Sequence, residues 1–145
     1  MAFYWASQPS SKLTFEIWVG ADKSLVDDTL HKQLETICTD AGMKKFDVRT
    51  YNPQDHYYPQ AFALQANTVA IYILGKDEAT AIAETGMFRT IDGQYGQKNT
   101  LSYNGDVIGV EFVEGYYVLI NNNSKKSSEL LMAVFDAVVN YEVKR

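Results

Sequence analysis

The sequence predicts an α/β fold: a three-layer α/β/α sandwich around a mostly parallel central sheet of about five strands, closed by an antiparallel hairpin. The first observation is the stretch Thr68–Leu74, whose apolar residues follow one another without alternation until Gly75 ends the run. A strand that is apolar on both faces must be covered on both faces, which is typical of a parallel sheet flanked by helices. The second observation is that strand patterns alternate with helix patterns, as in right-handed βαβ units.

The length and the lack of internal boundaries predict one domain. A chain of 145 residues can bury a single core, and no linker or repeat interrupts residues 13–145, which we expect to form a single α/β domain. Residues 1–12 differ, because Met1–Ala6 is apolar and aromatic and Ser7–Lys12 is polar and turn-forming. Tyr and Trp concentrate at membrane interfaces, so this segment is interpreted as a juxtamembrane tail of an anchor upstream, or else as a flexible terminus.

The first three elements follow from their hydrophobic periods. Leu13–Val19 alternates apolar and polar residues, so a strand is expected there. Helical spacing of apolar residues predicts a helix over Leu25–Ala41, with Gly42 at its C-terminal cap. Alternation over Phe46–Thr50 predicts the second strand, which Asn52-Pro53 stops.

The middle of the chain carries a weaker helix signal and then the apolar strand. A short helix is expected within Asp55–Asn67, where Pro59 suits the first turn. The strand Thr68–Leu74 follows, and then a short helix over Asp77–Thr85, with its first residue as N-cap or first-turn acid. Residues 87–104 show no periodicity and are expected to form loops and turns.

The chain closes with a hairpin and a helix. Val107–Val113 and Tyr116–Ile120 flank Glu114-Gly115, which predicts a β-hairpin. The last helix has apolar residues at helical spacing and a serine cap at Ser127 or Ser128. These assignments give the order β-α-β-α-β-α, a loop, β-β, α.

Net charge, cysteine count and motif spacing count against nucleic-acid binding, a disulfide framework and a metal site. The net charge of -5 disfavours nucleic acid, whose recognition needs a basic face. Cys38 is the single cysteine, so no intrachain disulfide can form, and its apolar helical position predicts a buried, inert thiol. No spacing is typical of a zinc site, a phosphate loop or an EF-hand, so no metal and no cofactor are predicted.

Candidate ligand-binding residues lie where the predicted parallel strands end. The carboxyl ends of such strands meet at one edge of the sheet, and ligands of open α/β sheets bind there. Aromatic residues at this edge could stack on a sugar or a peptide. The residues expected to bind ligand are Trp18, Asp22, Tyr51, Asp55, His56, Tyr57, Lys76 and Asp77.

The same loops leave an enzyme as the alternative. Asp22, Asp55, His56 and Asp77 could approach one another and form an acid–base or metal site. The simpler interpretation is that Asp22 and Asp77 cap helices and that His56 is solvated. No serine lies in a nucleophile elbow, so no catalytic residue is assigned and binding is expected over catalysis.

Four segments carry a resemblance to a known family. The strand Leu13–Trp18 before a long helix and the later strand Thr68–Leu74 resemble the opening of extracytoplasmic solute-binding proteins of ABC importers. Glu84–Phe88 is similar to the short segment that follows the later strand, and Val107–Ile120 is similar to the passage toward the second lobe. Family members trap a ligand between two lobes, whereas this chain has the length of one.

The resemblance implies a non-catalytic, extracytoplasmic binding or interaction domain of bacterial type. The aromatic segment Met1–Ala6 adds the possibility of a membrane tether upstream of residue 1. A single lobe offers half a cleft, so its partner would be a small molecule, a glycan, a peptide or a protein at the cell surface. A small α/β enzyme with acidic and histidine loops stays the alternative. A homodimer formed through the carboxyl edge is a third possibility, and it would bury the half-cleft.

Overall fold

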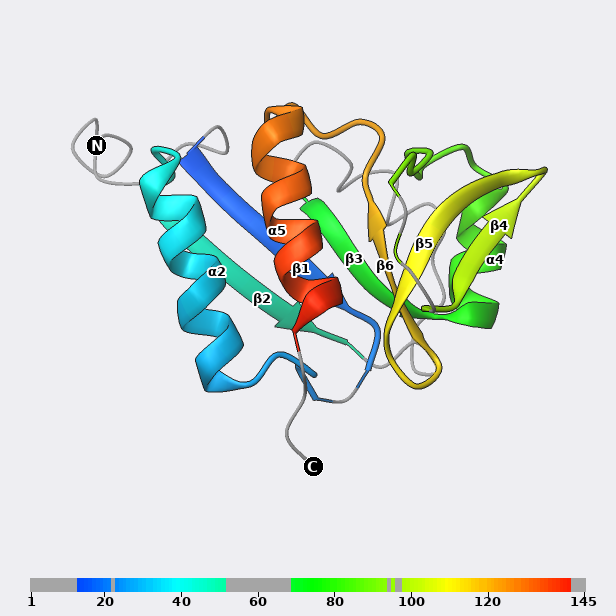
Figure 1. Cartoon of the computed structure of the whole chain (residues 1–145), viewed down its shortest axis with the longest axis horizontal. Helices are drawn as coiled ribbons and strands as arrows, with labels where there is room; N and C mark the ends of the chain where they lie inside the picture. The colour runs from blue at the N-terminus through cyan, green and yellow to red at the C-terminus, as the bar shows by residue number, and fades with distance from the viewer. Residues whose placement is uncertain (1–12, 22, 52–68, 94, 96–97, 142–145) are drawn as a thin grey trace, which may run out of the picture.

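One six-stranded sheet with helices on both faces organises the computed structural model (Figure 1). The structure describes residues 13–21, 23–51, 69–93, 95 and 98–141. Its strands are β1 (Thr14–Val19), β2 (Lys45–Thr50), β3 (Val69–Gly75), β4 (Thr100–Tyr103), β5 (Asp106–Val113) and β6 (Tyr116–Ile120). The helices within these residues are α2 (Asp28–Asp40), α4 (Lys76–Ala83) and α5 (Ser128–Asn140).

The sheet is mixed, with the strand order β2-β1-β3-β6-β5-β4. β1 pairs in parallel with β2 on one side and with β3 on the other. The three remaining neighbouring pairs are antiparallel, including the predicted hairpin of β5 and β6. One half of the sheet is therefore a parallel unit and the other half an antiparallel meander.

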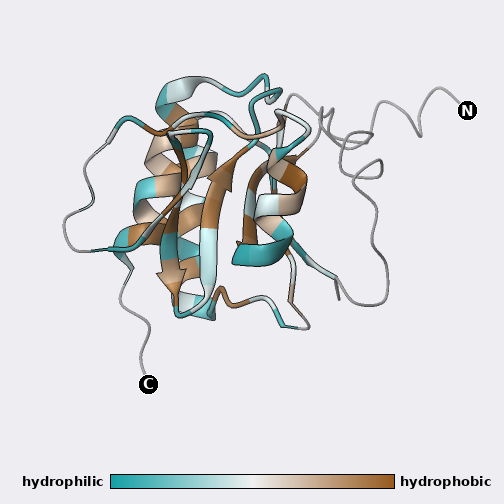
Figure 2. Cartoon of the chain, turned by 90° about the vertical axis from the view of Figure 1, so that its right-hand side faces the viewer, coloured by the Kyte–Doolittle hydropathy of each residue, from teal (hydrophilic) through white to brown (hydrophobic). Residues whose placement is uncertain are grey.

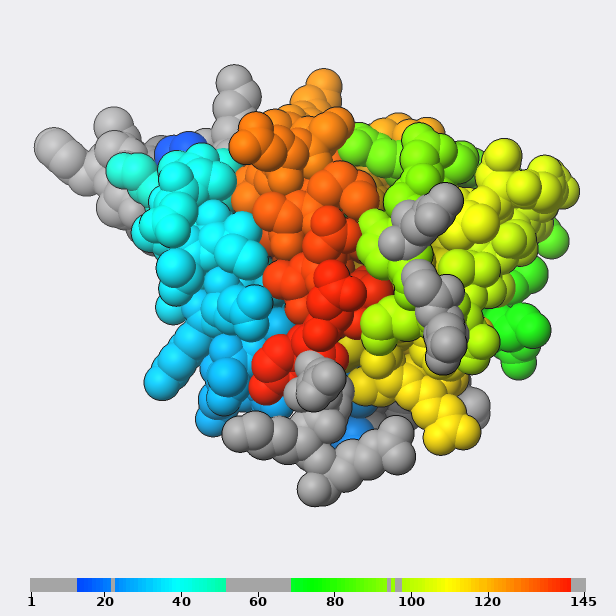
Figure 3. All heavy atoms as spheres, viewed as in Figure 1, coloured from blue at the N-terminus to red at the C-terminus, as the bar shows by residue number. Residues whose placement is uncertain are grey.

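The helices divide between the two faces of the sheet. α2 and α5 lie side by side on one face, as Figures 1 and 3 show, and they enclose a core that includes Phe15 and Phe135. α4 lies on the opposite face, where Tyr72 and Leu119 pack against Ile82. β3 is buried on both faces, as its unbroken apolar run predicts, and the central strands in Figure 2 are accordingly brown.

Helix caps account for where two of the helices begin. Asp27 caps α2 by accepting a 2.8 Å hydrogen bond from Leu30 N, and Ser127 caps α5 by accepting a 3.1 Å bond from Leu130 N. Both capped starts fall within about three residues of the starts read from the sequence. α4 begins at Lys76, with Gly75 at the N-cap and Asp77 in the first turn.

The sheet departs from the predicted one in strand number and in direction. It has six strands and more antiparallel than parallel pairs, whereas about five mostly parallel strands are predicted. The additional strand is β4, which lies inside the segment expected to form loops. It is four residues long, and a register shift between Leu101 and Ser102 interrupts it, so it offers no sustained alternation to read. Its turn, Asn104-Gly105, has both residues at positive φ, as a tight hairpin requires.

Two of the sequence predictions concern residues that the structure does not describe, and a third concerns Cys38. The short helix expected within Asp55–Asn67 and the tail 1–12 lie outside the described residues. Cys38 is described, and its prediction is confirmed: the thiol is 1% exposed, and burial raises its pKa to about 12.

Candidate functional site

The carboxyl ends of the parallel strands lie together at one edge of the sheet, the lower edge in Figure 1. Gly20 N donates to Ile73 O at 2.9 Å, and Tyr51 N donates to Val19 O at 3.1 Å. These bonds extend the pairing one residue past β1 and β2, so the residues that follow start from fixed positions. The turn between β5 and β6 reaches the same edge, because Tyr116 at the start of β6 pairs with the last residue of β3.

The structure brings together two of the eight predicted ligand-binding residues. The rings of Trp18 and Tyr51 lie 6.0 Å apart, centroid to centroid, at an interplanar angle of 60°. Lys76 and Asp77 are exposed in the first turn of α4, and within the described chain neither side chain makes a hydrogen bond or an ion pair. Asp22, Asp55, His56 and Tyr57 lie outside the described residues, so the predicted acid–base cluster stays a prediction.

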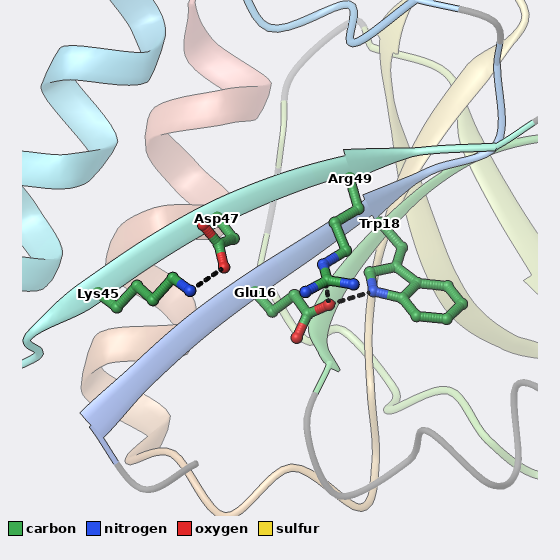
Figure 4. A network of polar contacts seen from close by, with 5 residues as sticks. All are labelled: Glu16, Trp18, Lys45, Asp47 and Arg49. Carbon is green, nitrogen blue, oxygen red and sulfur yellow. Dashed lines mark hydrogen bonds and ion pairs between the residues drawn. The ribbon is translucent and has the colours of Figure 1, made fainter. Parts of the chain in front are cut away.

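A buried carboxylate fixes the orientation of Trp18 (Figure 4). Glu16, two residues earlier on β1, is only 8% exposed, and its Oε1 accepts a 2.6 Å bond from Trp18 Nε1. The same oxygen lies 3.1 Å from Arg49 Nε of the neighbouring strand β2. A second ion pair on β2 joins Lys45 and Asp47 at 3.4 Å. The charged side chains on β1 and β2 therefore pair with one another, and the Glu16 carboxylate also fixes the indole ring of Trp18.

Glu78 is a functional candidate that the sequence analysis missed. Tyr51 OH donates a 2.9 Å hydrogen bond to Glu78 Oε2, while Glu78 Oε1 is buried and has no hydrogen-bond partner among the described residues. The carboxyl group fills the space beside Gly20, where any Cβ would overlap Glu78 Oε1. One signal could have found this residue: Glu78 lies four positions before Ile82, on the buried stripe of α4.

The environment of Glu78 favours its protonated form. Burial raises the pKa of the Glu78 carboxyl above its ordinary value, and the hydrogen bond from Tyr51 lowers that pKa in part. Burial and the adjacent Glu78 carboxyl also raise the pKa of Tyr51, so the phenol stays protonated and acts as the donor. The pair can therefore hold a proton to a higher pH than an exposed glutamate can.

A groove of about 1070 Å³ opens at the same edge, on the face that α2 and α5 cover. One wall is the segment Lys23–Asp27 before α2, and the other is the β5–β6 hairpin with Asn99. Its floor combines the buried side chains of Val26 and Phe112 with half-buried apolar neighbours. The lining residues are Lys23, Ser24, Leu25, Val26, Asp27, Asn99, Glu111, Phe112, Val113, Glu114 and Tyr116.

The first wall is strained at one residue and anchored at another. Leu25 has φ of 60°, in the left-handed region that costs a non-glycine residue about 1–2 kcal/mol. Such strain persists where the surroundings over-determine it, and it clusters at functional sites. Asp27, which caps α2, also accepts 2.8 Å bonds from Tyr141 OH on both carboxylate oxygens. This bond ties the wall to the end of α5.

The second wall is braced by hydrogen bonds around Glu111. Asn99 Nδ2 donates to Glu111 Oε1 at 3.1 Å, and Glu111 N donates to Asn99 O at 2.9 Å. Gly115 N, in the turn, donates to Glu111 Oε2 at 3.4 Å. Glu114, at the tip of the hairpin, is exposed. Both walls therefore have defined positions, and the groove between them is preformed.

The charged groups of the lining are mostly acidic. Among the described residues of the lining, Asp27, Glu111 and Glu114 contribute carboxylates, and Lys23 contributes the single ammonium. Within the described part of the chain, no three His, Cys, Asp or Glu side chains gather closely enough to hold a metal ion.

Comparison with known proteins leaves the family open. No protein-family model matches this chain, and neither does any curated protein. Among the residues that the structure describes, no helix combines the length and the apolar composition needed to cross a membrane.

Proposed function

We propose that this domain is a non-catalytic binding module that takes its ligand in the groove at the carboxyl edge of the sheet. The observation that carries the proposal is the groove itself: a preformed space of about 1070 Å³ with an apolar floor and a few polar groups on its rim. Binding sites commonly combine such a floor with sparse polar groups, and open α/β sheets hold ligands at this edge.

The proposal retains the likeness to one lobe of a solute-binding protein. Such a lobe would be a three-layer α/β/α sandwich, and helices on both faces of the sheet support that arrangement. The antiparallel meander departs from a mostly parallel sheet. An extracytoplasmic setting with a tether upstream is part of the same proposal, supported by the aromatic segment Met1–Ala6 and the polar spacer after it.

A thermal-shift screen tests the proposal. The purified domain is screened against sugars, amino acids, short peptides and divalent metals. A ligand present at about 100 times its Kd should add about 2.7 kcal/mol to the free energy of unfolding, which raises Tm by several degrees. The substitution Val113→Trp fills the groove and should abolish this shift. Val107→Trp, at a half-buried valine at the other end of β5, is the matched control. Flat curves, or shifts that Val113→Trp leaves intact, contradict the proposal.

The buried pair Glu78 and Tyr51 favours an enzyme as the second candidate. A carboxyl group whose pKa is raised by burial, and which a phenol holds at the sheet's carboxyl edge, suits general acid–base catalysis. A panel of chromogenic ester, glycoside, peptide and phosphate substrates tests it. Turnover that is lost in Glu78→Gln, but kept in Val113→Trp, would establish the enzyme over the binding module.

A further inference from the structure

The groove has properties that select one class of ligand. We propose that its occupant is an extended peptide segment in which a lysine or arginine side chain lies next to an apolar side chain. This inference rests on the proposed function, because it names the chemistry of the ligand at the same site. It is argued from the size of the groove, its floor and the charge of its rim.

The size of the groove favours an extended occupant over a compact small molecule. Pockets for small ligands usually measure about 300–1000 Å³. The present groove, at about 1070 Å³, lies at the upper end of that range and runs between two separate chain segments. An extended peptide would contact both walls at once, whereas a single sugar or amino acid would leave much of this space to water.

The floor of the groove offers a place for an apolar side chain. Phe112 and Val26 are each 7% exposed and belong to the main core, so they form a fixed base. Leu25, Val113 and Tyr116 are half-buried and border that base, with part of their apolar surface open to an occupant. An apolar side chain seated here would remove apolar surface from water on both partners, which is the usual centre of a binding interface.

The rim of the groove is complementary to a cation. Among the described lining residues, Asp27, Glu111 and Glu114 carry carboxylates and Lys23 carries an ammonium, so this part of the lining has a net charge of -2. Glu111 accepts from the side-chain amide of Asn99 and from the peptide N–H of Gly115. Glu114 lies at the exposed tip of the hairpin, where its carboxylate can meet a guanidinium or ammonium group. Opposite charge at the rim of an interface selects partners and accelerates association.

Four fluorescein-labelled hexapeptides test the inference by fluorescence anisotropy. Three of them alternate leucine with arginine, with glutamine or with glutamate, and the fourth alternates serine with arginine. We expect the arginine–leucine peptide to bind at least about tenfold more tightly than the glutamate–leucine peptide, and more weakly as salt rises. The arginine–serine peptide should bind more weakly than the arginine–leucine peptide, because it lacks the apolar side chains that fill the floor.

Charge variants locate the binding. Glu114→Lys should weaken the arginine–leucine peptide about 3- to 10-fold, and Glu111→Gln should weaken it as well. Glu129→Lys makes the same change of charge in the first turn of α5, outside the groove lining, and should leave the affinity unchanged. Equal losses in Glu114→Lys and Glu129→Lys would mean non-specific attraction and would overturn the inference.

The remaining outcomes separate this inference from the proposed function. Tight binding of the neutral or acidic peptide that Val113→Trp abolishes would keep the groove as the binding site but overturn the cationic ligand. Equal affinity for the arginine–serine and arginine–leucine peptides would overturn the role of the apolar floor. Failure of every peptide, together with a flat thermal-shift screen, would overturn both proposals.

Discussion

The carboxyl edge of the sheet is closed on one face of the sheet and open on the other. On the side of α4, the space beside Gly20 is filled by Glu78, which Tyr51 holds through a hydrogen bond. On the side of α2 and α5, the segment Lys23–Asp27 and the β5–β6 hairpin stand apart and leave a groove. One edge therefore supports both a closed, proton-holding pair and an open binding surface. The difference arises because a helix follows β3 directly, whereas a strained loop separates β1 from α2.

The largest effects should come from the cores that support the two sides. Leu30→Ala, on α2, and Ile82→Ala, on α4, each remove a fully buried side chain and should lower the free energy of unfolding by about 2–5 kcal/mol. Urea denaturation measures both losses. Leu30 follows the lining residue Asp27 by one helical turn and donates its N–H to that side chain, so only Leu30→Ala should also weaken ligand binding. Equal effects of the two variants on binding would mean that the two sides are not independent.

A smaller loss is expected from the anchor of the groove wall. Asp27→Ala removes the N-cap of α2 and should cost about 1 kcal/mol of stability. It also frees the wall from Tyr141, so ligand affinity should fall with it. Asp28→Ala removes a neighbouring acid of the first turn that is not the cap, and serves as the control in thermal unfolding. Unchanged ligand affinity in Asp27→Ala would mean that Asp27 does not hold the groove wall in position.

The closed side predicts a dependence of stability on pH. Because the pKa of Glu78 is raised in the folded state, the native protein holds this proton to a higher pH than the unfolded chain does. The contribution of Glu78 to stability is therefore complete below the ordinary glutamate pKa, and it is lost as the pH rises through the folded pKa. Glu78→Gln should remove this decline, whereas Glu84→Gln, at an exposed position, should retain it. Identical pH profiles for wild type and Glu78→Gln would contradict the burial of an acid.

The smallest effect should come from the surface partner of the buried carboxylate. Arg49 pairs with Glu16, but its side chain is 63% exposed, so solvent screens the pair. Arg49→Ala should cost about 0.5 kcal/mol and should disturb the near-ultraviolet circular dichroism of Trp18. Lys45→Ala removes another exposed cation of β2 and should leave the Trp18 signal unchanged.

The comparison also separates what could be predicted from what could not. Patterns that depend on neighbours in the chain succeeded: the doubly buried β3, the hairpin of β5 and β6, and the serine cap of α5. The short, shifted strand β4 failed, because four residues with a break in register carry no readable period. Glu78 was passed over because a charged residue on a helix is usually exposed, although its spacing from Ile82 pointed inward.

The sequence alone determined the class of the fold, the burial of Cys38 and the position of Trp18 and Tyr51 near the carboxyl ends of their strands. These depend on local periodicity and on the rule that parallel strands end at a common edge. Tertiary structure alone decided that Glu78 turns into the space beside Gly20, and that the segment carrying Leu25 faces the β5–β6 hairpin across a groove. Those contacts join residues far apart in the chain, and their geometry follows from how the elements pack, which no local pattern encodes.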